Sequence, residues 1–220
     1  MCAAALFFMM TSGLVLAADT TKAEPVQAVA AATQAKAKTA QAAPVQQTYS
    51  LDLDTTKYEK KTMTVDGKKV AFRAYENRVY VAHPVDTTYQ SMNIYVPEGY
   101  FNGKTINGYT AKTAPIFLPN TVGGYMPGAP GQPSENDRMT GGANAMLVAL
   151  SKGYVVAAPG ARGRTTQAAD GTYTGKAPAL IVDIKAAVRY LRHNAGKLPG
   201  DTEKIISNGT SAGGALSTLI

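Results

Sequence analysis

The sequence contains one cysteine, two histidines and no tryptophan among its 220 residues. One cysteine rules out a disulfide scaffold and a metal site built from cysteine. Charged residues make up only 17% of the chain, and although the net charge is +7, lysine and arginine form no run longer than a pair. Such dispersed charge is typical of a solvated surface, so no nucleic-acid partner is expected.

No apolar run is long enough for a typical membrane span. Residues 1–18 carry no charged side chain and include an apolar stretch from Ala3 to Met10. Small residues follow, and the pattern predicts a signal peptide over residues 1–18 that is cleaved near Ala17 or Ala18. The protein is then secreted or periplasmic, with no stable membrane span after cleavage. A basic leader is missing, which suggests a start codon further upstream. An uncleaved apolar tail is the alternative.

Residues 19–48 consist mainly of alanine, threonine, glutamine, lysine and proline. This composition buries too little apolar surface to offset the entropy lost on ordering, so it predicts a disordered tether. An alanine-rich helix is the alternative. The folded domain is therefore expected over residues 49–220.

Beyond the tether, short apolar runs alternate first with turns and then with helical patterns. Strands are predicted at residues 62–65, 69–75, 78–82, 91–96, 114–118, 154–158 and 204–207, the first two joined by an Asp66-Gly67 turn. Helices are predicted at residues 143–150, between Pro178 and Gly196, and after Ser211. Alternating buried strands and amphipathic helices indicate an α/β fold with a mostly parallel sheet and helices on both faces.

The segment Gly209-Thr210-Ser211-Ala212-Gly213 has the pattern G-x-S-x-G. An apolar strand precedes it and a helical pattern follows, which is the setting of a nucleophile elbow. In such an elbow a sharp turn strains the serine backbone, and a Cβ at either glycine would collide with the adjoining strand or helix. Ser211 is therefore the candidate nucleophile. The alternative is a glycine-rich turn in which Ser211 only caps a helix.

Acyl transfer also needs hydrogen-bond donors for a tetrahedral oxyanion. The backbone N–H of Ala212 is one candidate, and the loop after the apolar strand ending at Leu118 should supply the other. This loop contains Gly123 and Gly124, whose backbone amides can approach a substrate without side-chain obstruction. A plain flexible turn is the alternative. Candidates for substrate contact in the same loop are Thr121, Val122 and Gly123.

Three segments resemble bacterial tannases, which are α/β-hydrolases that cleave gallate esters. They are APIFLPNTVGGYMPG at residues 114–128, GRTT at residues 163–166, and the stretch from Pro178 to Leu216 that ends in the G-x-S-x-G pattern. The resemblance implies that Ser211 is the nucleophile and that the backbone amides of Ala212 and Gly124 form the oxyanion hole. Feruloyl esterases share much of this pattern, so the family is better defined than the substrate.

No acid and no histidine follow Ser211, although this fold orders its triad as serine, acid and histidine. We expect His83 to cap or pack at a strand end, and His193 to be either a favourable charge at a helix C-terminus or a surface residue. Asp183 and Asp201 are expected to hold local backbone structure. The chain is thus expected to be truncated after the elbow, to leave the elbow strand as an uncovered edge, and to be poorly soluble and inert by itself.

Arg162 and Arg164 follow the strand that ends at Ala158, at the end of the sheet where open α/β proteins bind ligands. In one interpretation these arginines anchor the long loop over residues 160–176 through carbonyl contacts. In the other they contact an anionic or phenolic substrate.

The sequence as a whole predicts a secreted serine esterase, similar to tannases, that forms an acyl-enzyme on Ser211. Its expected partner is a small aromatic ester, and neither a metal nor an organic cofactor is required. The alternatives are a broader aryl or feruloyl esterase and a non-catalytic remnant or binding module. The sequence predicts neither the acyl specificity nor the oligomeric state.

Overall fold

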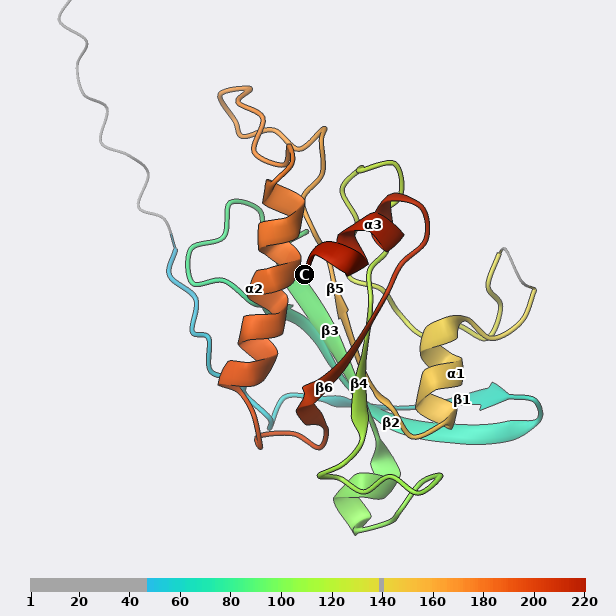
Figure 1. Cartoon of the computed structure of the whole chain (residues 1–220). Helices are drawn as coiled ribbons and strands as arrows, with labels where there is room; N and C mark the ends of the chain where they lie inside the picture. The colour runs from blue at the N-terminus through green and yellow to red at the C-terminus, as the bar shows by residue number, and fades with distance from the viewer. Residues whose placement is uncertain (1–46, 139–140) are drawn as a thin grey trace, which may run out of the picture. The chain divides into compact units, whose positions relative to one another are not determined.

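The computed structural model describes residues 47–138 and 141–220, all of which belong to the unit Pro44–Ile220 (Figure 1). The predicted signal peptide and nearly all of the predicted tether lie outside the described residues. In the described part, the strands form one sheet in the order β1-β2-β3-β5-β4-β6. These strands are β1 (Glu59–Val65), β2 (Lys68–Val79), β3 (Ser91–Pro97), β4 (Pro115–Pro119), β5 (Val155–Pro159) and β6 (Asp201–Asn208).

The sheet is mixed. Strands β1, β2, β3 and β5 pair antiparallel in succession, whereas β4 pairs parallel with both β5 and β6. The expectation of a mostly parallel sheet is therefore wrong for the described residues. Parallel neighbours need a crossover that returns the chain to the starting end of the sheet, and only the connections after β4 and β5 contain an α-helix that does so.

The predicted hairpin around Asp66-Gly67 is present between β1 and β2. Both turn residues have positive φ, 49° for Asp66 and 74° for Gly67, as a tight turn of this type requires. The separate strand predicted at residues 78–82 is wrong, because β2 continues to Val79 through an irregularity in its pairing with β3. Asn77 has a φ of 56° at this irregularity, a conformation that asparagine tolerates better than most residues.

The α-helices of the described part are α1 (Ala145–Ser151), α2 (Ala179–His193) and α3 (Ala212–Leu219), and η1 (Glu98–Asn102) is a short 3₁₀ helix. The side chain of Asn144 caps α1 by accepting a hydrogen bond from the backbone N–H of Leu147, at 3.0 Å. Gly153 follows α1 with a φ of 86°, as its predicted role in ending the helix requires. Within the described residues, none of the helices is both long enough and apolar enough to cross a membrane.

The two faces of the sheet are covered by different helices. On one face, strand residues such as Ile94 and Leu118 form a core with Ile184 of α2. On the other, Phe117 forms a core with Leu147 of α1. Neighbouring residues of a strand point to opposite faces, so β4 contributes to both cores. The predicted arrangement of helices on both faces is confirmed, and Figure 1 shows α1 and α2 on opposite sides of the strands.

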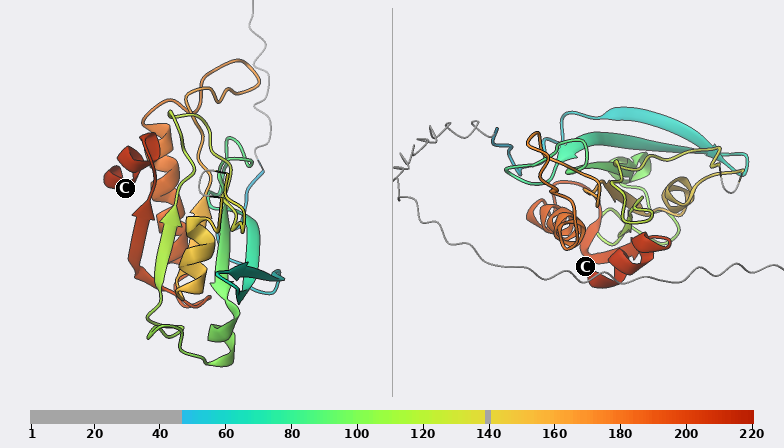
Figure 2. Two further views of the ribbon diagram at one scale, coloured as in Figure 1. Left: turned by 90° about the vertical axis from the view of Figure 1, so that its right-hand side faces the viewer. Right: turned by 90° about the horizontal axis from the view of Figure 1, so that it is seen from above.

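Strand β6 forms one edge of the described sheet, next to β4, as Figure 2 shows. The parallel strands β4, β5 and β6 all end at the same end of the sheet, where the turn into α3 and the loops after β4 and β5 come together (Figure 1). Open α/β sheets bind their ligands at this end.

Candidate active site

Ser211 lies in the turn between β6 and α3. Its backbone has φ 56° and ψ −122°, which is strained for any residue other than glycine. Its side chain is exposed and, within the described residues, makes no hydrogen bond that caps α3. The geometry is therefore that of a nucleophile elbow, which presents the hydroxyl at the amino end of a helix, and a simple capping role is not supported.

The two glycines of the pattern allow an asparagine from the loop after β4 to approach the elbow. A Cβ on Gly213 would lie 2.5 Å from Oδ1 of Asn120 and 2.9 Å from the carbonyl oxygen of Val122. A Cβ on Gly209 would overlap the backbone of Gly213 and lie 2.7 Å from Nδ2 of Asn120. The glycines are thus needed for contact with this loop as well as for the turn itself.

These contacts predict different effects of alanine at two glycines near the site. We expect Gly213→Ala to lower the free energy of unfolding by about 1–3 kcal/mol, because the added methyl group overpacks the contact with Asn120. A Cβ on Gly123 would meet no atom within 4 Å, so Gly123→Ala should stay within about 0.5 kcal/mol of the unmodified protein. Urea denaturation of both variants measures the difference. Equal stabilities would contradict this account of the elbow.

Neither of the two predicted oxyanion donors has a backbone acceptor in the described part of the chain. Ala212 is the first residue of α3, so its backbone N–H has no acceptor within the helix. Gly124 is exposed in the loop after β4, and its N–H donates to no group in the described part of the chain. Because the carbonyl of Val122 lies against Gly213, this loop runs beside the elbow.

The three loop residues predicted to contact substrate have different surroundings. The Val122 side chain is buried in the core shared with α2, so any contact of Val122 with a substrate has to be made by its backbone. The neighbours of Val122 in the sequence are threonine and glycine, and they do not indicate that its side chain is buried. The Thr121 hydroxyl donates to the carbonyl of Ala129 at 2.8 Å and closes the base of the loop. Gly123 remains exposed at its tip.

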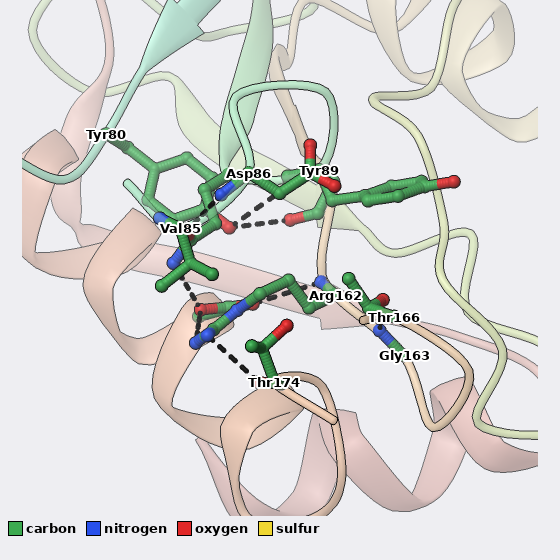
Figure 3. A network of polar contacts seen from close by, with 11 residues as sticks. Tyr80, Val85, Asp86, Tyr89, Arg162, Gly163, Thr166 and Thr174 are labelled. Carbon is green, nitrogen blue, oxygen red and sulfur yellow. Dashed lines mark hydrogen bonds and ion pairs between the residues drawn. The ribbon is translucent and has the colours of Figure 1, made fainter. Parts of the chain in front are cut away.

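Arg162 is held in a network between the loop after β5 and helix α2 (Figure 3). Its Nε lies 2.9 Å from Oδ2 of Asp183 and its Nη2 2.8 Å from Oδ1, while Nη1 donates to the carbonyl of Thr174 at 2.9 Å. The hydrogen bond to Asp183 raises the pKa of the Arg162 guanidinium. These contacts support the anchoring interpretation of Arg162. The expectation that Asp183 holds local backbone structure is wrong, because its carboxylate binds residues 21 and 93 positions away.

Arg164 has a different environment. It is exposed beside the loop after β4, where its backbone N–H donates to the carbonyl of Tyr125 at 2.8 Å and its Nε lies 3.5 Å from Sδ of Met126. Tyr125 and Met126 are 43% and 40% exposed. These two residues were not predicted as site residues from the sequence. The signal that could have indicated them is the position of two large side chains directly after paired glycines in a loop.

Within the described residues, neither histidine makes a hydrogen bond with Ser211. His193 ends α2, whose carboxyl end lies at the end of the sheet where β6 begins, opposite the elbow (Figure 1). Its Nε2 lies 3.4 Å from Oδ1 of Asp52. His83 is exposed in the connection between β2 and β3 and makes no hydrogen bond within the described residues, so the expected capping or packing of His83 is wrong. Asp201 binds its own segment, as predicted, through the backbone N–H of Glu203 at 3.1 Å.

Comparisons with known proteins agree with this geometry. The family model BD-FAE, which describes feruloyl esterase-like α/β-hydrolase domains, matches residues 126–220. The crystal structure of Fusobacterium nucleatum tannase is 58% identical with a TM-score of 0.74, over 76% of this chain and 35% of that chain. This is a tannase-like α/β-hydrolase chain. The resemblance inferred from the motifs is confirmed, and so is the α/β-hydrolase fold.

Other solved structures give the same result for the tannase-like chain. A tannase from Lactobacillus plantarum is 47% identical with a TM-score of 0.68, over 76% of this chain and 35% of that chain. A tannin acyl hydrolase in complex with ethyl gallate is 46% identical with a TM-score of 0.68, over 76% of this chain and 36% of that chain. The chain thus spans about a third of the length of these tannases. No curated protein matches it.

Proposed function

We propose that the tannase-like chain supplies the nucleophile and the oxyanion hole of a serine esterase. The Ser211 oxygen attacks the ester carbonyl as a base takes its proton, and the alcohol leaves after the carbon–oxygen bond breaks. Water then hydrolyses the acyl-enzyme and releases the acid. The backbone N–H groups of Ala212 and Gly124 stabilise the oxyanion in both steps. The strained, exposed backbone of Ser211 at the amino end of α3 carries this proposal.

The acid and the base of the triad are proposed to lie outside residues 1–220. Neither His83 nor His193 makes a hydrogen bond with Ser211 in the described part of the chain, and the chain spans only about a third of the tannases that it resembles. A protein of tannase length has room for both groups.

Galloyl esters are the proposed substrates. One similar structure holds ethyl gallate and another, 46% identical, holds 3,4-dihydroxybenzoate, and both ligands are phenolic. In this chain, the exposed side chains of Tyr125 and Met126 provide an apolar surface for an aromatic ring, and Arg164 beside them can bind a phenolic oxygen. Gly123 allows the ring to approach the backbone closely. The match to the BD-FAE family supports a feruloyl esterase as the second candidate.

The substrate is tested by comparing kcat/KM for methyl gallate, ethyl ferulate and phenyl acetate on the full-length protein that carries residues 1–220. We expect the gallate ester to be preferred, and Arg164→Gln to raise the KM for methyl gallate while KM for phenyl acetate is unchanged. A preference for the ferulate would favour the second candidate. If no ester is hydrolysed and a fluorophosphonate probe does not label Ser211, the chain is a binding module or a non-catalytic remnant.

Secretion is part of the same proposal. It depends on residues 1–18, whose apolar, uncharged pattern is that of a signal peptide. Amino-terminal sequencing of the protein recovered from the periplasm or the medium should begin directly after Ala17 or Ala18. An intact amino terminus on cytoplasmic protein would contradict it.

A further inference from the structure

Asn120 is the first residue after β4 and begins the loop that carries Gly124. It is 8% exposed, and its backbone N–H donates to the carbonyl of Asn208 at 2.9 Å, which extends the pairing of β4 with β6 beyond the strand end. Asn120 therefore lies directly beneath the turn that contains Ser211.

The Asn120 side chain contacts the elbow on both sides of the nucleophile. Its Nδ2 lies 3.1 Å from the carbonyl oxygen of Asn208, which precedes Ser211, and 3.1 Å from that of Gly213, which follows it. A third acceptor at 3.1 Å is the hydroxyl of Ser217, one turn further along α3. The amide thus joins the strand before the nucleophile to the helix after it.

The same side chain fits a space that the elbow leaves open. Both glycines of the G-x-S-x-G pattern face it, since a Cβ on Gly209 or Gly213 would come within 2.7 Å or 2.5 Å of the Asn120 amide. Its Oδ1 is buried without a hydrogen-bond partner in the described part of the chain. A buried acceptor without a partner disfavours folding, so stability alone does not account for an asparagine here.

We propose that Asn120 is a positioning residue for the oxyanion hole. It fixes the start of the Gly124 loop to the two segments that flank Ser211, and so it sets the separation between the N–H of Gly124 and the N–H of Ala212. It also holds the Ser211 backbone in its strained conformation. This role rests on the proposed serine esterase function and extends it to a residue that touches neither the substrate nor the reacting atoms.

Asn194 provides a matched control. It is also a buried asparagine, 6% exposed, and its side chain also makes three hydrogen bonds, to backbone groups of Leu51, Leu53 and Tyr190, at 2.8–2.9 Å. It lies at the end of α2 that faces away from the elbow. Replacing either asparagine by leucine removes a similar set of hydrogen bonds and keeps a side chain of similar size.

The test measures kcat, KM and the melting temperature of Asn120→Leu and Asn194→Leu in the full-length protein. Both variants should melt at lower temperature, but only Asn120→Leu should lose kcat, by about 100-fold, with KM for methyl gallate little changed. The rate of fluorophosphonate labelling should fall in parallel. If kcat of Asn120→Leu stays within twofold of the unmodified protein, its role is purely structural and the inference is wrong.

A second variant is used if Asn120→Leu does not fold. Asn120→Asp keeps the shape of the side chain but replaces the donor by an oxygen that faces two carbonyl groups, so it should also lose kcat. An active Asn120→Asp would overturn the inference. An unmodified protein that neither hydrolyses esters nor reacts with the probe would instead contradict the proposed function. The two failures are therefore distinguishable.

Discussion

Replacing Ser211 by alanine is expected to abolish both ester hydrolysis and fluorophosphonate labelling of the full-length protein. The variant removes only the exposed hydroxyl from the elbow and leaves the backbone amides of Ala212 and Gly124 unchanged. Loss of a serine nucleophile lowers kcat by at least about 10⁴-fold. Hydrolysis of methyl gallate, followed by product chromatography, measures this loss. Residual turnover above about 1% of the unmodified rate would show that another group is the nucleophile.

Ser211→Gly separates the catalytic effect of losing the hydroxyl from the effect of backbone strain at Ser211 on stability. It should be as inactive as Ser211→Ala, because both variants lack the hydroxyl. Glycine adopts φ 56°, ψ −122° without a Cβ clash, whereas alanine keeps the strain of the native serine. We therefore expect Ser211→Gly to be more stable than Ser211→Ala by about 1 kcal/mol in urea denaturation. A less stable glycine variant would show that the elbow stores no strain.

The parts of the site that could be predicted from sequence are those that depend on neighbours in the chain. The turn at Ser211 needs glycine two residues before and two after it, and the hairpin needs Asp66-Gly67, so both leave a local pattern. The limits of α1 are signalled in the same way, since an asparagine cap and a glycine with positive φ are local features.

The parts that could not be predicted depend on residues far apart in the sequence. Asn120 binds Gly213 across 93 positions, and nothing beside Asn120 in the sequence indicates that contact. The sequence around Arg162 and Arg164 does not distinguish the two arginines. In the structure, Arg162 binds the buried carboxylate of Asp183, 21 positions away, and Arg164 does not. The antiparallel part of the sheet escaped prediction for a related reason, because strand direction is set by connections and not by the composition of the strands.

The Arg162–Asp183 pair leads to the second large expected effect, on stability. Asp183 is 1% exposed and accepts four hydrogen bonds: three from Arg162, through its backbone N–H, Nε and Nη2, and one from Nε2 of Gln90, all at 2.8–3.0 Å. Gln90 in turn accepts a hydrogen bond from the backbone N–H of Val85 at 2.6 Å. Helix α2 is thus joined through one carboxylate to the loop after β5 and to the connection between β2 and β3.

Asp183→Ala should lower the free energy of unfolding by about 3–5 kcal/mol, because it leaves the charge of Arg162 buried without a carboxylate to balance it. The double variant Asp183→Leu/Arg162→Met removes both charges and should recover much of this loss, since apolar residues of similar volume often replace a buried ion pair at little cost. Asp52→Ala, which breaks an exposed pair with Lys197, is the control and should change stability far less. If Asp183→Ala and Asp52→Ala have similar effects in urea denaturation, the buried pair does not hold these three segments together.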